Sequence, residues 1–266
     1  MGSVPGTLEL CNTQVTLPLL MDLILSDIHS NLQALRTVIR YAKRRAIERY
    51  VFLGDLVGYG ANPNETLGLI RLLEPRVLVR GNHDRACVTP GSELGFSLPA
   101  RSAINWTRGQ LTPENAWFLE RMPIGPLEVG GAYLIAHGSP LDEDTYLLHP
   151  REALHAFDGF TGQLCFFGHT HLTEGYELDE GAQRMTRLTF EPGIWFQLRD
   201  HCRYLINPGS VGQPRDRDPR LSFMTYDPAN RRLKLHRMEY DCVGAARAIL
   251  AAGLHPNLAE RLHHGI

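Results

Sequence analysis

The chain has 266 residues, of which 43% are hydrophobic and 21% are charged, a composition typical of a folded globular protein rather than a disordered or fibrous one. Its 27 basic and 29 acidic residues give a formal net charge of −2, so no general electrostatic attraction to nucleic acid or to an anionic membrane is expected. Five cysteines without a close pair argue against a disulfide framework and a cysteine zinc site, and favour a reducing cytoplasm.

The first twenty residues have neither a basic leader with an apolar core nor the roughly 18 apolar residues of a membrane span. No targeting segment and no membrane association are therefore predicted. The sequence restarts plausibly at Met21, directly before an expected strand, so residues 1–20 are interpreted as an extension without chemistry. Residues 21–266 contain no repeat, low-complexity tract or linker, and we expect them to form one domain.

Short apolar runs of strand length recur along the chain, and each ends in glycine or polar residues. They lie at residues 22–26, 50–53, 77–79, 133–136 and 164–167. Apolar residues at helical spacing follow the first two runs, within residues 31–46 and 62–73. This β-α-β-α-β opening predicts a largely parallel sheet covered by helices, in which the loops beyond the strands carry the ligands.

The second half of the chain follows a different pattern. Residues 99–122 are predicted to be helical, with Thr112 and Pro113 as a favourable helix start. Residues 186–238 alternate between strand-like runs and turns, which predicts antiparallel hairpins. The tail from Asp241 is rich in alanine and leucine and is expected to form one or two helices.

Residues that bind metals or act as acids and bases follow each of the five early strands. Five of the twelve histidines lie directly beyond a strand end, a placement that the composition does not require. The residues are Asp27 and His29, Asp55, the group Asn82, His83 and Asp84, His137, and His169 with His171.

These side chains have the chemistry of a metal site. Residues two apart on an extended chain point the same way, so Asp27 with His29, and His169 with His171, can each chelate an ion. Mixed oxygen and imidazole donors without a thiolate suit Mn, Fe, Co, Ni or Zn better than calcium. The ligands are too many for one tetrahedral ion, and two ions about 3.5–4 Å apart are common in phosphoryl chemistry. The sequence therefore predicts a dinuclear site.

The ordered series D-x-H, G-D, G-N-H-D, a single H and G-H-x-H resembles the calcineurin-like metallophosphoesterase family over roughly residues 21–226. The resemblance implies an α/β fold, a four-layer αββα sandwich of two mixed β-sheets with helices outside. It also implies two divalent ions, with manganese expected first and iron, zinc, nickel or cobalt as alternatives. By this likeness one ion would be held by Asp27, His29 and His171, the other by Asn82, His137 and His169, and Asp55 would bridge both.

The resemblance further implies that His83 acts at the leaving group and that Asp84 orients it. The chemistry agrees, since metal-activated water supplies a bridging hydroxide that attacks phosphorus directly, without a covalent enzyme intermediate. As an imidazolium fixed by Asp84 through its other nitrogen, His83 would protonate the departing oxygen. A purely structural hydrogen bond between these two residues stays open as the alternative.

The sequence specifies the residues that contact the substrate less closely than it specifies the metal ligands. Asn31 would either bind a phosphate oxygen or cap the following helix. Arg215, Arg217 and Arg220 would either meet a phosphate or nucleotide or remain solvated. Protein phosphatases and symmetrical dinucleoside tetraphosphate hydrolases of the family usually carry an arginine shortly after G-D, where this chain has Tyr59. That difference favours phosphodiesters or small nucleotides, although Arg85 or Arg215 is able to replace the missing arginine.

The predicted function is the hydrolysis of a phosphodiester or a small nucleotide by a cytoplasmic enzyme with two metal ions, with homo-oligomerisation left open. The enzymatic alternatives are a phosphomonoesterase or protein phosphatase and a dinucleoside polyphosphate hydrolase. A metal-binding scaffold that uses the same fold is the non-enzymatic alternative. A nuclease is disfavoured because the sequence shows no basic track for a nucleic acid.

Overall fold

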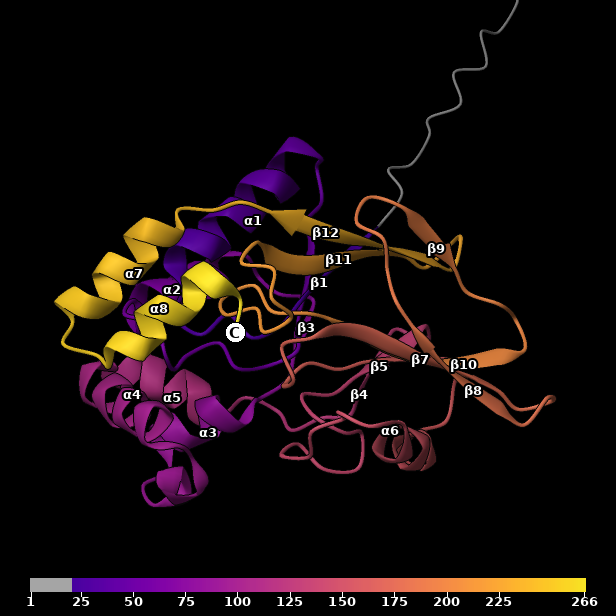
Figure 1. The fold of residues 1–266 in the computed structure, drawn as a ribbon, viewed down its shortest axis with the longest axis horizontal. Helices are drawn as coiled ribbons and strands as arrows, with labels where there is room; N and C mark the ends of the chain where they lie inside the picture. The colour runs from indigo at the N-terminus through magenta and orange to yellow at the C-terminus, as the bar shows by residue number, and fades with distance from the viewer. Residues whose placement is uncertain (1–20) are drawn as a thin grey trace, which may run out of the picture.

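The structure, a computed structural model, describes residues 21–266, so the interpretation of residues 1–20 as an extension lies outside the described residues. Two six-stranded sheets form the middle of this part of the chain (Figure 1). The order of the first sheet is β3 (Val77–Leu78), β2 (Arg49–Phe52), β1 (Asp22–Leu25), β11 (Leu221–Asp227), β12 (Arg232–Met238) and β9 (Trp195–Gln197). The order of the second is β4 (Leu127–Val129), β5 (Tyr133–Ile135), β6 (Leu164–Phe166), β10 (Cys202–Pro208), β7 (Thr173–Asp179) and β8 (Arg184–Leu188).

Both sheets are mixed. In the first sheet β1, β2 and β3 run parallel, whereas β11, β12 and β9 are joined to them by antiparallel pairs. In the second sheet β5, β6 and β10 run parallel, and β4, β7 and β8 pair antiparallel with their neighbours. The parallel strands of each sheet are followed by the loops that carry the predicted ligands.

Helices cover the outer faces of the sheets. They are α1 (Leu32–Arg44), α2 (Pro63–Leu72), α3 (Asn82–Val88), α4 (Leu98–Gln110), α5 (Pro113–Glu120), α6 (Pro150–Ala156), α7 (Cys242–Ala251) and α8 (Pro256–His264). Two short 3-10 turns lie at Ser92–Gly95 and Phe157–Gly159. Helices α1 to α5 contribute to the core beneath the first sheet, and α6 covers the second sheet. Helices α7 and α8 pack against α4 in a separate cluster (Figure 1).

The alternation of side chains along β1 shows why the layers form. Leu23 and Leu25 point toward the helices, while Ile24 between them belongs to the core between the two sheets. All three are fully buried. On the second sheet Phe166 faces the inter-sheet core and Cys165 faces α6. Strands buried on both faces are apolar throughout, which explains the short continuous runs in the sequence. The predicted four-layer αββα sandwich is therefore confirmed.

The predicted hairpin region is only partly correct. Antiparallel hairpins were expected throughout residues 186–238, and β11 and β12 do pair in this way, but β8 lies in the second sheet and β9 in the first. The chain crosses between the sheets in the intervening segment, and strand β10 then runs parallel to β6 rather than in a simple hairpin. Strand β7 escaped prediction because its residues Thr173–Asp179 alternate without a continuous apolar run.

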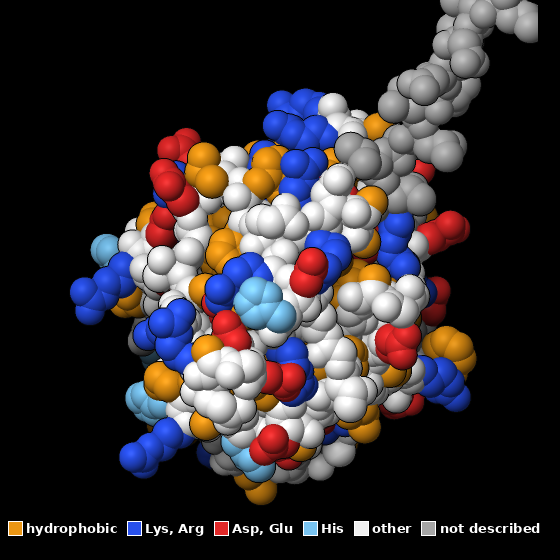
Figure 2. All heavy atoms as spheres, turned by 90° about the vertical axis from the view of Figure 1, so that its right-hand side faces the viewer, with side chains coloured by type: hydrophobic (Ala, Val, Ile, Leu, Met, Phe, Trp, Pro, Cys, Tyr) orange, Lys and Arg blue, Asp and Glu red, His pale blue; other side chains and the backbone are white. Residues whose placement is uncertain are grey.

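The side of the molecule on which β8 and β9 lie mixes basic, acidic and apolar side chains, and no single large apolar area dominates it (Figure 2). Among residues 21–266, none of the helices is long and apolar enough to cross a membrane.

Candidate metal centre

All seven predicted metal ligands meet at one place. They lie in the loops after β1, β2, β5 and β6 and at the first residue of α3, so both sheets contribute. Each is buried, with Asn82 the most exposed at 7%. The side chains of Asp27, His29, Asp55 and His171 form one group whose donor atoms lie within 4.8 Å of one another, and Asp55, His137 and His169 form a second such group.

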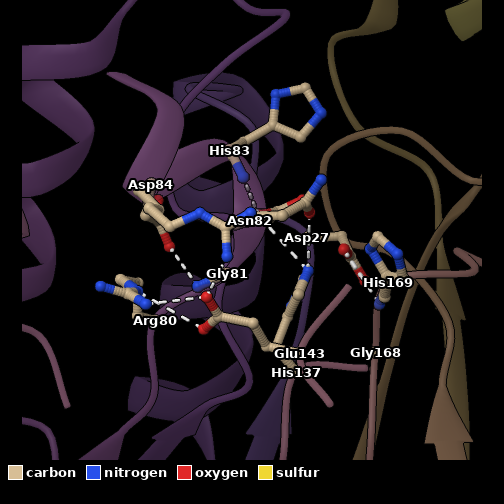
Figure 3. Close-up of polar contacts among 12 residues, drawn as sticks. Asp27, Arg80, Gly81, Asn82, His83, Asp84, His137, Glu143, Gly168 and His169 are labelled. Carbon is tan, nitrogen blue, oxygen red and sulfur yellow. Dashed lines mark hydrogen bonds and ion pairs between the residues drawn. The ribbon is translucent and has the colours of Figure 1, made fainter. Parts of the chain in front are cut away.

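Asp55 belongs to both groups. Its Oδ2 atom lies 3.5 Å from Nε2 of His29, and its Oδ1 atom lies 3.5 Å from Nε2 of His137. The carboxylate therefore turns one oxygen toward each group. Asn82 joins the second group, because its Oδ1 atom is 3.1 Å from Nε2 of His137 (Figure 3).

The histidine tautomers in the first group leave two lone pairs facing each other. Nδ1 of His29 donates to the Val57 carbonyl at 3.0 Å, and Nδ1 of His171 donates to the Gln213 carbonyl at 2.6 Å. In the neutral form, each Nε2 atom then carries no proton. These two Nε2 atoms are 3.1 Å apart, an arrangement that is repulsive without a cation between them.

The distances between the remaining donor atoms also suit divalent ions. Oδ1 of Asp27 lies 3.4 Å from Nε2 of His171, whereas its Oδ2 atom is buried and has no hydrogen-bond partner among the described residues. Donors held 2.0–2.2 Å from one ion at tetrahedral to octahedral angles lie about 3.0–3.5 Å apart. The observed spacings match this range. In the second group Nε2 of His169 donates to the Asp144 carbonyl at 3.1 Å, which leaves the lone pair of Nδ1 available to an ion.

Burial sets the protonation of these groups. It raises the pKa of Asp27 to about 7, an effect that His137 partly offsets and the neighbouring Asp55 reinforces. Burial, followed by the nearby Asp84 carboxylate, raises the pKa of Asp55 well above its usual value. Burial also lowers the pKa of His171 well below its usual value, with Arg215 and His29 adding to the effect. Neutral imidazoles and carboxylates that resist ionisation are the donors that nearby cations would stabilise.

The loops hold their ligands in left-handed backbone conformations. The φ angles are +54° for Asp27, +49° for His29, +52° for Asp55, +66° for His169 and +60° for His171. Such angles are uncommon for residues other than glycine and cluster at functional sites. The prediction that the D-x-H and H-x-H pairs converge because the chain is extended was therefore wrong in its reason. The side chains meet because tight loops turn them toward one point.

Two glycines of the motifs owe their presence to close packing. A Cβ atom on Gly81 would lie 2.1 Å from Oδ1 of Asp55, and one on Gly168 would lie 1.9 Å from Oγ of Ser26. Neither residue has a positive φ angle, so both positions need glycine for lack of space and not for its backbone freedom. A side chain at Gly81 would displace the carboxylate shared by the two ligand groups.

Asp84 forms no hydrogen bond with the side chain of His83. Its Oδ1 atom accepts hydrogen bonds from the backbone N–H groups of Leu56 and Val57 at 2.8 and 3.1 Å. Its Oδ2 atom accepts from the N–H of Gly81 at 3.0 Å (Figure 3). The expected orienting contact is absent because these three donors occupy the carboxylate. Asp84 instead ties the loop after β2 to the start of α3.

His83 is buried beside the first ligand group. Its ring centroid is 4.4 Å from that of Tyr59, 4.8 Å from that of His29 and 4.9 Å from that of Phe96. Its Nδ1 atom has no hydrogen-bond partner among the described residues. Burial, followed by the charge of Arg215, lowers the pKa of His83 well below its usual value. The imidazolium expected from sequence is therefore not the form that this structure favours.

The side chain of Asn31 has a structural role. Its Oδ1 atom caps α1 by accepting from the N–H of Ala34 at 3.1 Å, and its Nδ2 atom donates to the Gly212 carbonyl at 2.8 Å. The Nδ2 atom also donates to the hydroxyl of Tyr240 at 3.3 Å. The capping alternative describes this residue, and no polar atom of its side chain is left for a phosphate.

A cleft of about 570 Å³ opens beside Asn82 and His169, and it contains three of the four predicted substrate contacts. Tyr59 and Arg215 lie together there, since Nη2 of Arg215 donates to the Tyr59 hydroxyl at 3.3 Å. Arg85 also lines the cleft, but its guanidinium is paired with Glu143 and with both oxygens of Asp144. Its charge is therefore already compensated.

Tyr146 and Arg261 are among the cleft residues that the sequence did not predict. Tyr146 stacks on His169 with ring centroids 3.7 Å apart. Arg261 comes from α8, which is distant in sequence from every motif. Nothing local in the sequence marks either residue, because both reach the cleft through the packing of separate elements.

Comparisons with known proteins agree with this geometry. A model of the calcineurin-like phosphoesterase superfamily domain matches residues 21–231. An uncharacterized protein of Methanocaldococcus jannaschii is 37% identical over 245 residues, covering 91% of this chain and 97% of that protein. The crystal structure of a metallophosphoesterase from Sphaerobacter thermophilus is 37% identical, with a TM-score of 0.82 over 93% of this chain and 99% of that one.

A hypothetical protein from Pyrococcus horikoshii, at 18% identity, shares the fold with a TM-score of 0.73 over 92% of this chain and 98% of its own. The family match covers all of the loops that carry the ligand groups. The chain therefore belongs to the calcineurin-like phosphoesterase superfamily, and it is a metal-dependent phosphoester hydrolase.

Proposed function

We propose that this enzyme hydrolyses a small phosphodiester or nucleotide at a centre of two divalent ions. The observation that carries the proposal is the shared carboxylate of Asp55, which turns one oxygen to each of two buried ligand groups. The adjoining cleft of about 570 Å³ has the size of a small-molecule site.

The first ion would be held by Asp27, His29 and His171, and the second by Asn82, His137 and His169, with Asp55 between them. Nε2 would be the ligand atom of each of these histidines except His169, which would use Nδ1. When bound, such ions supply an activated water and neutralise charge on the phosphoryl oxygens. We propose manganese first for these ions, with iron, zinc, nickel or cobalt as alternatives, because mixed carboxylate, amide and imidazole donors suit such metals.

The remaining chemistry would fall to the residues around the ions. Hydrolysis adds the oxygen of water to phosphorus and breaks the bond to the leaving oxygen, which needs a proton unless it departs as a stable anion. We assign this proton donation to His83, whose ring lies beside His29 at the edge of the first group. The negative charge of a bound substrate would raise the pKa of His83 and so supply the imidazolium form that the free site disfavours. Arg215 would bind an anionic substrate oxygen, and Tyr59 holds its guanidinium in place.

The preference for diesters and nucleotides rests on the residues near the G-D motif. Tyr59 stands in the neighbourhood where phosphatases of the family usually carry an arginine, and its ring packs against His29 and His83. The nearby Arg85 is held by two carboxylates, so it offers no free cation for a phosphomonoester dianion. Three buried free cysteines among the described residues support the cytoplasm as the working compartment.

The direct test is a substrate panel assayed with added manganese and with excess chelator. Bis-p-nitrophenyl phosphate, p-nitrophenyl phosphate, cyclic nucleotides and dinucleoside polyphosphates separate the substrate classes. We expect chelation to abolish hydrolysis and manganese to restore it. Full activity in dialysed protein with excess chelator would refute the proposal. Bound metal without hydrolysis of any of these esters would favour the scaffold alternative.

A further inference from the structure

Residues 138–146 form a loop after β5 that reaches back to the second ligand group and holds one of its histidines. Nε2 of His169 donates to the backbone carbonyl of Asp144 at 3.1 Å. The ring of Tyr146 stacks on that of His169, with the centroids 3.7 Å apart and the planes inclined by 28°. A carbonyl and an aromatic face from one short stretch of chain thus fix both the tautomer and the plane of this imidazole.

The 138–146 loop is closed on itself and begins at another candidate ligand. The N–H of Ser139 donates to the Thr145 carbonyl at 3.2 Å, which brings the two ends of the loop together. A Cβ atom on Gly138 would lie 2.6 Å from the Glu143 carbonyl oxygen, so the loop folds tightly over this glycine. Gly138 directly follows His137. The loop therefore connects two histidines of the second ligand group.

Ion pairs with α3 and the residues before it hold the 138–146 loop in place. Nη2 of Arg85 donates to both carboxylate oxygens of Asp144 at 2.8 Å, and Nη1 of Arg85 pairs with Glu143. Arg80 also pairs with Glu143, at 2.7 Å (Figure 3). Among residues 21–266, Arg85 is the one cation that pairs with Asp144. Arg85 therefore connects α3 to the residue whose carbonyl orients His169.

The two ligand groups differ in how their histidines are oriented. In the first group, Nδ1 of each histidine donates to the carbonyl of a buried residue, Val57 or Gln213. The carbonyl that orients His169 belongs instead to Asp144, whose side chain is 48% exposed. The orientation of His169 thus depends on a surface loop and its ion pairs, whereas core packing fixes the histidines of the first group.

We propose that Arg85 is a positioning residue for the second ion. It acts through the 138–146 loop, which holds His169 with Nδ1 free for the ion, so its loss should weaken the second ion and spare the first. This inference rests on the proposed function, which assigns His169 to the second ion. Partners that orient a metal-bound histidine typically contribute about 10–100-fold to metal affinity.

Manganese binding to chelator-treated, dialysed protein tests this role without turnover. Calorimetric titration of the wild-type protein should show two ions per chain. We expect Arg85→Gln to weaken one binding step about tenfold, the low end of the range because Arg85 acts through the loop, and to leave the other step unchanged. Arg85→Lys should retain part of the affinity, because its charge remains but its ammonium lacks the planar fork that serves two carboxylates. Asp144→Asn keeps the backbone carbonyl but loses the ion pair, and should weaken the same step.

Arg71→Gln is the matched control, because Arg71 pairs with Glu114 between α2 and α5, and neither residue belongs to a ligand group. It makes the same change of charge and also breaks an ion pair, and it should leave both binding steps intact. A second comparison uses His169→Ala, in which the proposed route to the ion is already cut. In that background Arg85→Gln should cause no further loss of manganese affinity.

Equal weakening of both steps in Arg85→Gln would overturn the proposal, and so would wild-type affinity at both steps. A further loss in the His169→Ala background would also overturn it, because the effect would then not pass through His169. If Arg85→Gln does not fold, Arg85→Lys and Asp144→Asn decide by the same comparison. Fewer than two ions in the wild-type protein would refute the dinuclear centre itself, whereas two ions with an unaffected Arg85→Gln would refute this inference alone.

Discussion

Nδ1 of each ligand histidine in the first group is held by a backbone carbonyl, and this contact decides which nitrogen faces the site. His29 is fixed by Val57 and His171 by Gln213. In the second group the Leu53 carbonyl accepts from Nδ1 of His137 at 2.8 Å. These bonds set the tautomer and the ring orientation before any ion arrives, so little rearrangement accompanies metal binding.

Asp55→Asn should lower metal content as well as rate. The substitution preserves shape but removes the negative charge shared by the two ligand groups, and an amide nitrogen cannot serve as a metal ligand beside its oxygen. We expect elemental analysis of purified protein to show the loss of at least one of two ions. Asp158→Asn, at a side chain that is 77% exposed, is the control and should keep both ions. Two ions bound per chain in Asp55→Asn would remove Asp55 from the bridging position.

His83→Ala should impair catalysis while leaving the ions bound, because His83 lies beside the ligand groups without belonging to either. If its N–H protonates the leaving oxygen, the loss in rate should reach about 10²–10⁴ for alkyl or ribose leaving groups. Nitrophenyl esters should lose less, since nitrophenolate departs without a proton. Rates measured across leaving groups of increasing acidity test this, and a uniform loss would assign His83 to positioning of the phosphoryl group instead.

At the scale of elements, the side-chain carboxylate of Asp84 connects α3 to the loop after β2. Asp84→Asn places an amide N–H₂ against one or more of the three backbone N–H groups that Asp84 accepts. Two donors then face each other in a buried site, which costs about 1–3 kcal/mol of the free energy of unfolding. We expect a lower denaturation midpoint in urea than for Asp158→Asn. An unchanged midpoint would mean that this contact does not stabilise the native loops.

The elements that the sequence predicted best are those buried on both faces. Strands β1, β2 and β6 are short apolar runs with polar ends, and their positions agree within one residue with the prediction. Strand β7 and the separation of β8 from β9 could not be predicted in this way. Sheet membership is decided by long-range pairing, such as that of Tyr204 with Leu164, which no local pattern encodes.

The residues of the candidate site were likewise only partly predictable from the sequence. The candidate metal ligands could be predicted because their side chains carry the chemistry and directly follow the strands. The position of Asp84 was not, because its partners are backbone N–H groups of Leu56, Val57 and Gly81, and backbone groups leave no signature in a sequence. Arg261 was missed because only the packing of α8 brings it to the cleft.

At the scale of the whole molecule, bound ions would link the two sheets. Asp27 and Asp55 follow strands of the first sheet, while His137, His169 and His171 follow strands of the second. An ion at 100 times its dissociation constant stabilises the folded protein by about 2.7 kcal/mol. Each kcal/mol corresponds to roughly 2–4 °C in a protein of this size. We therefore expect the melting temperature to fall by several degrees on chelation and to recover with manganese, as measured by scanning calorimetry.

A control for this effect is available in Asp55→Asn, which should show a smaller difference between the chelated and the manganese-loaded protein. Identical melting temperatures of wild-type protein in chelator and in manganese would contradict the link between ions and fold.

The candidate ligands are divided between the two sheets, and this division determines when during folding a metal centre can form. Strand β1 pairs with β11, so Asp22 meets Tyr226 only after most of the chain has been synthesised. Neither sheet by itself carries a complete set of donors for either ion, because each group contains residues from both. A chain that is still on the ribosome, or only partly folded, would therefore bind ions weakly, because its set of donor side chains is incomplete. We therefore expect the two ions to bind after both sheets have folded, so that the folded site would select them.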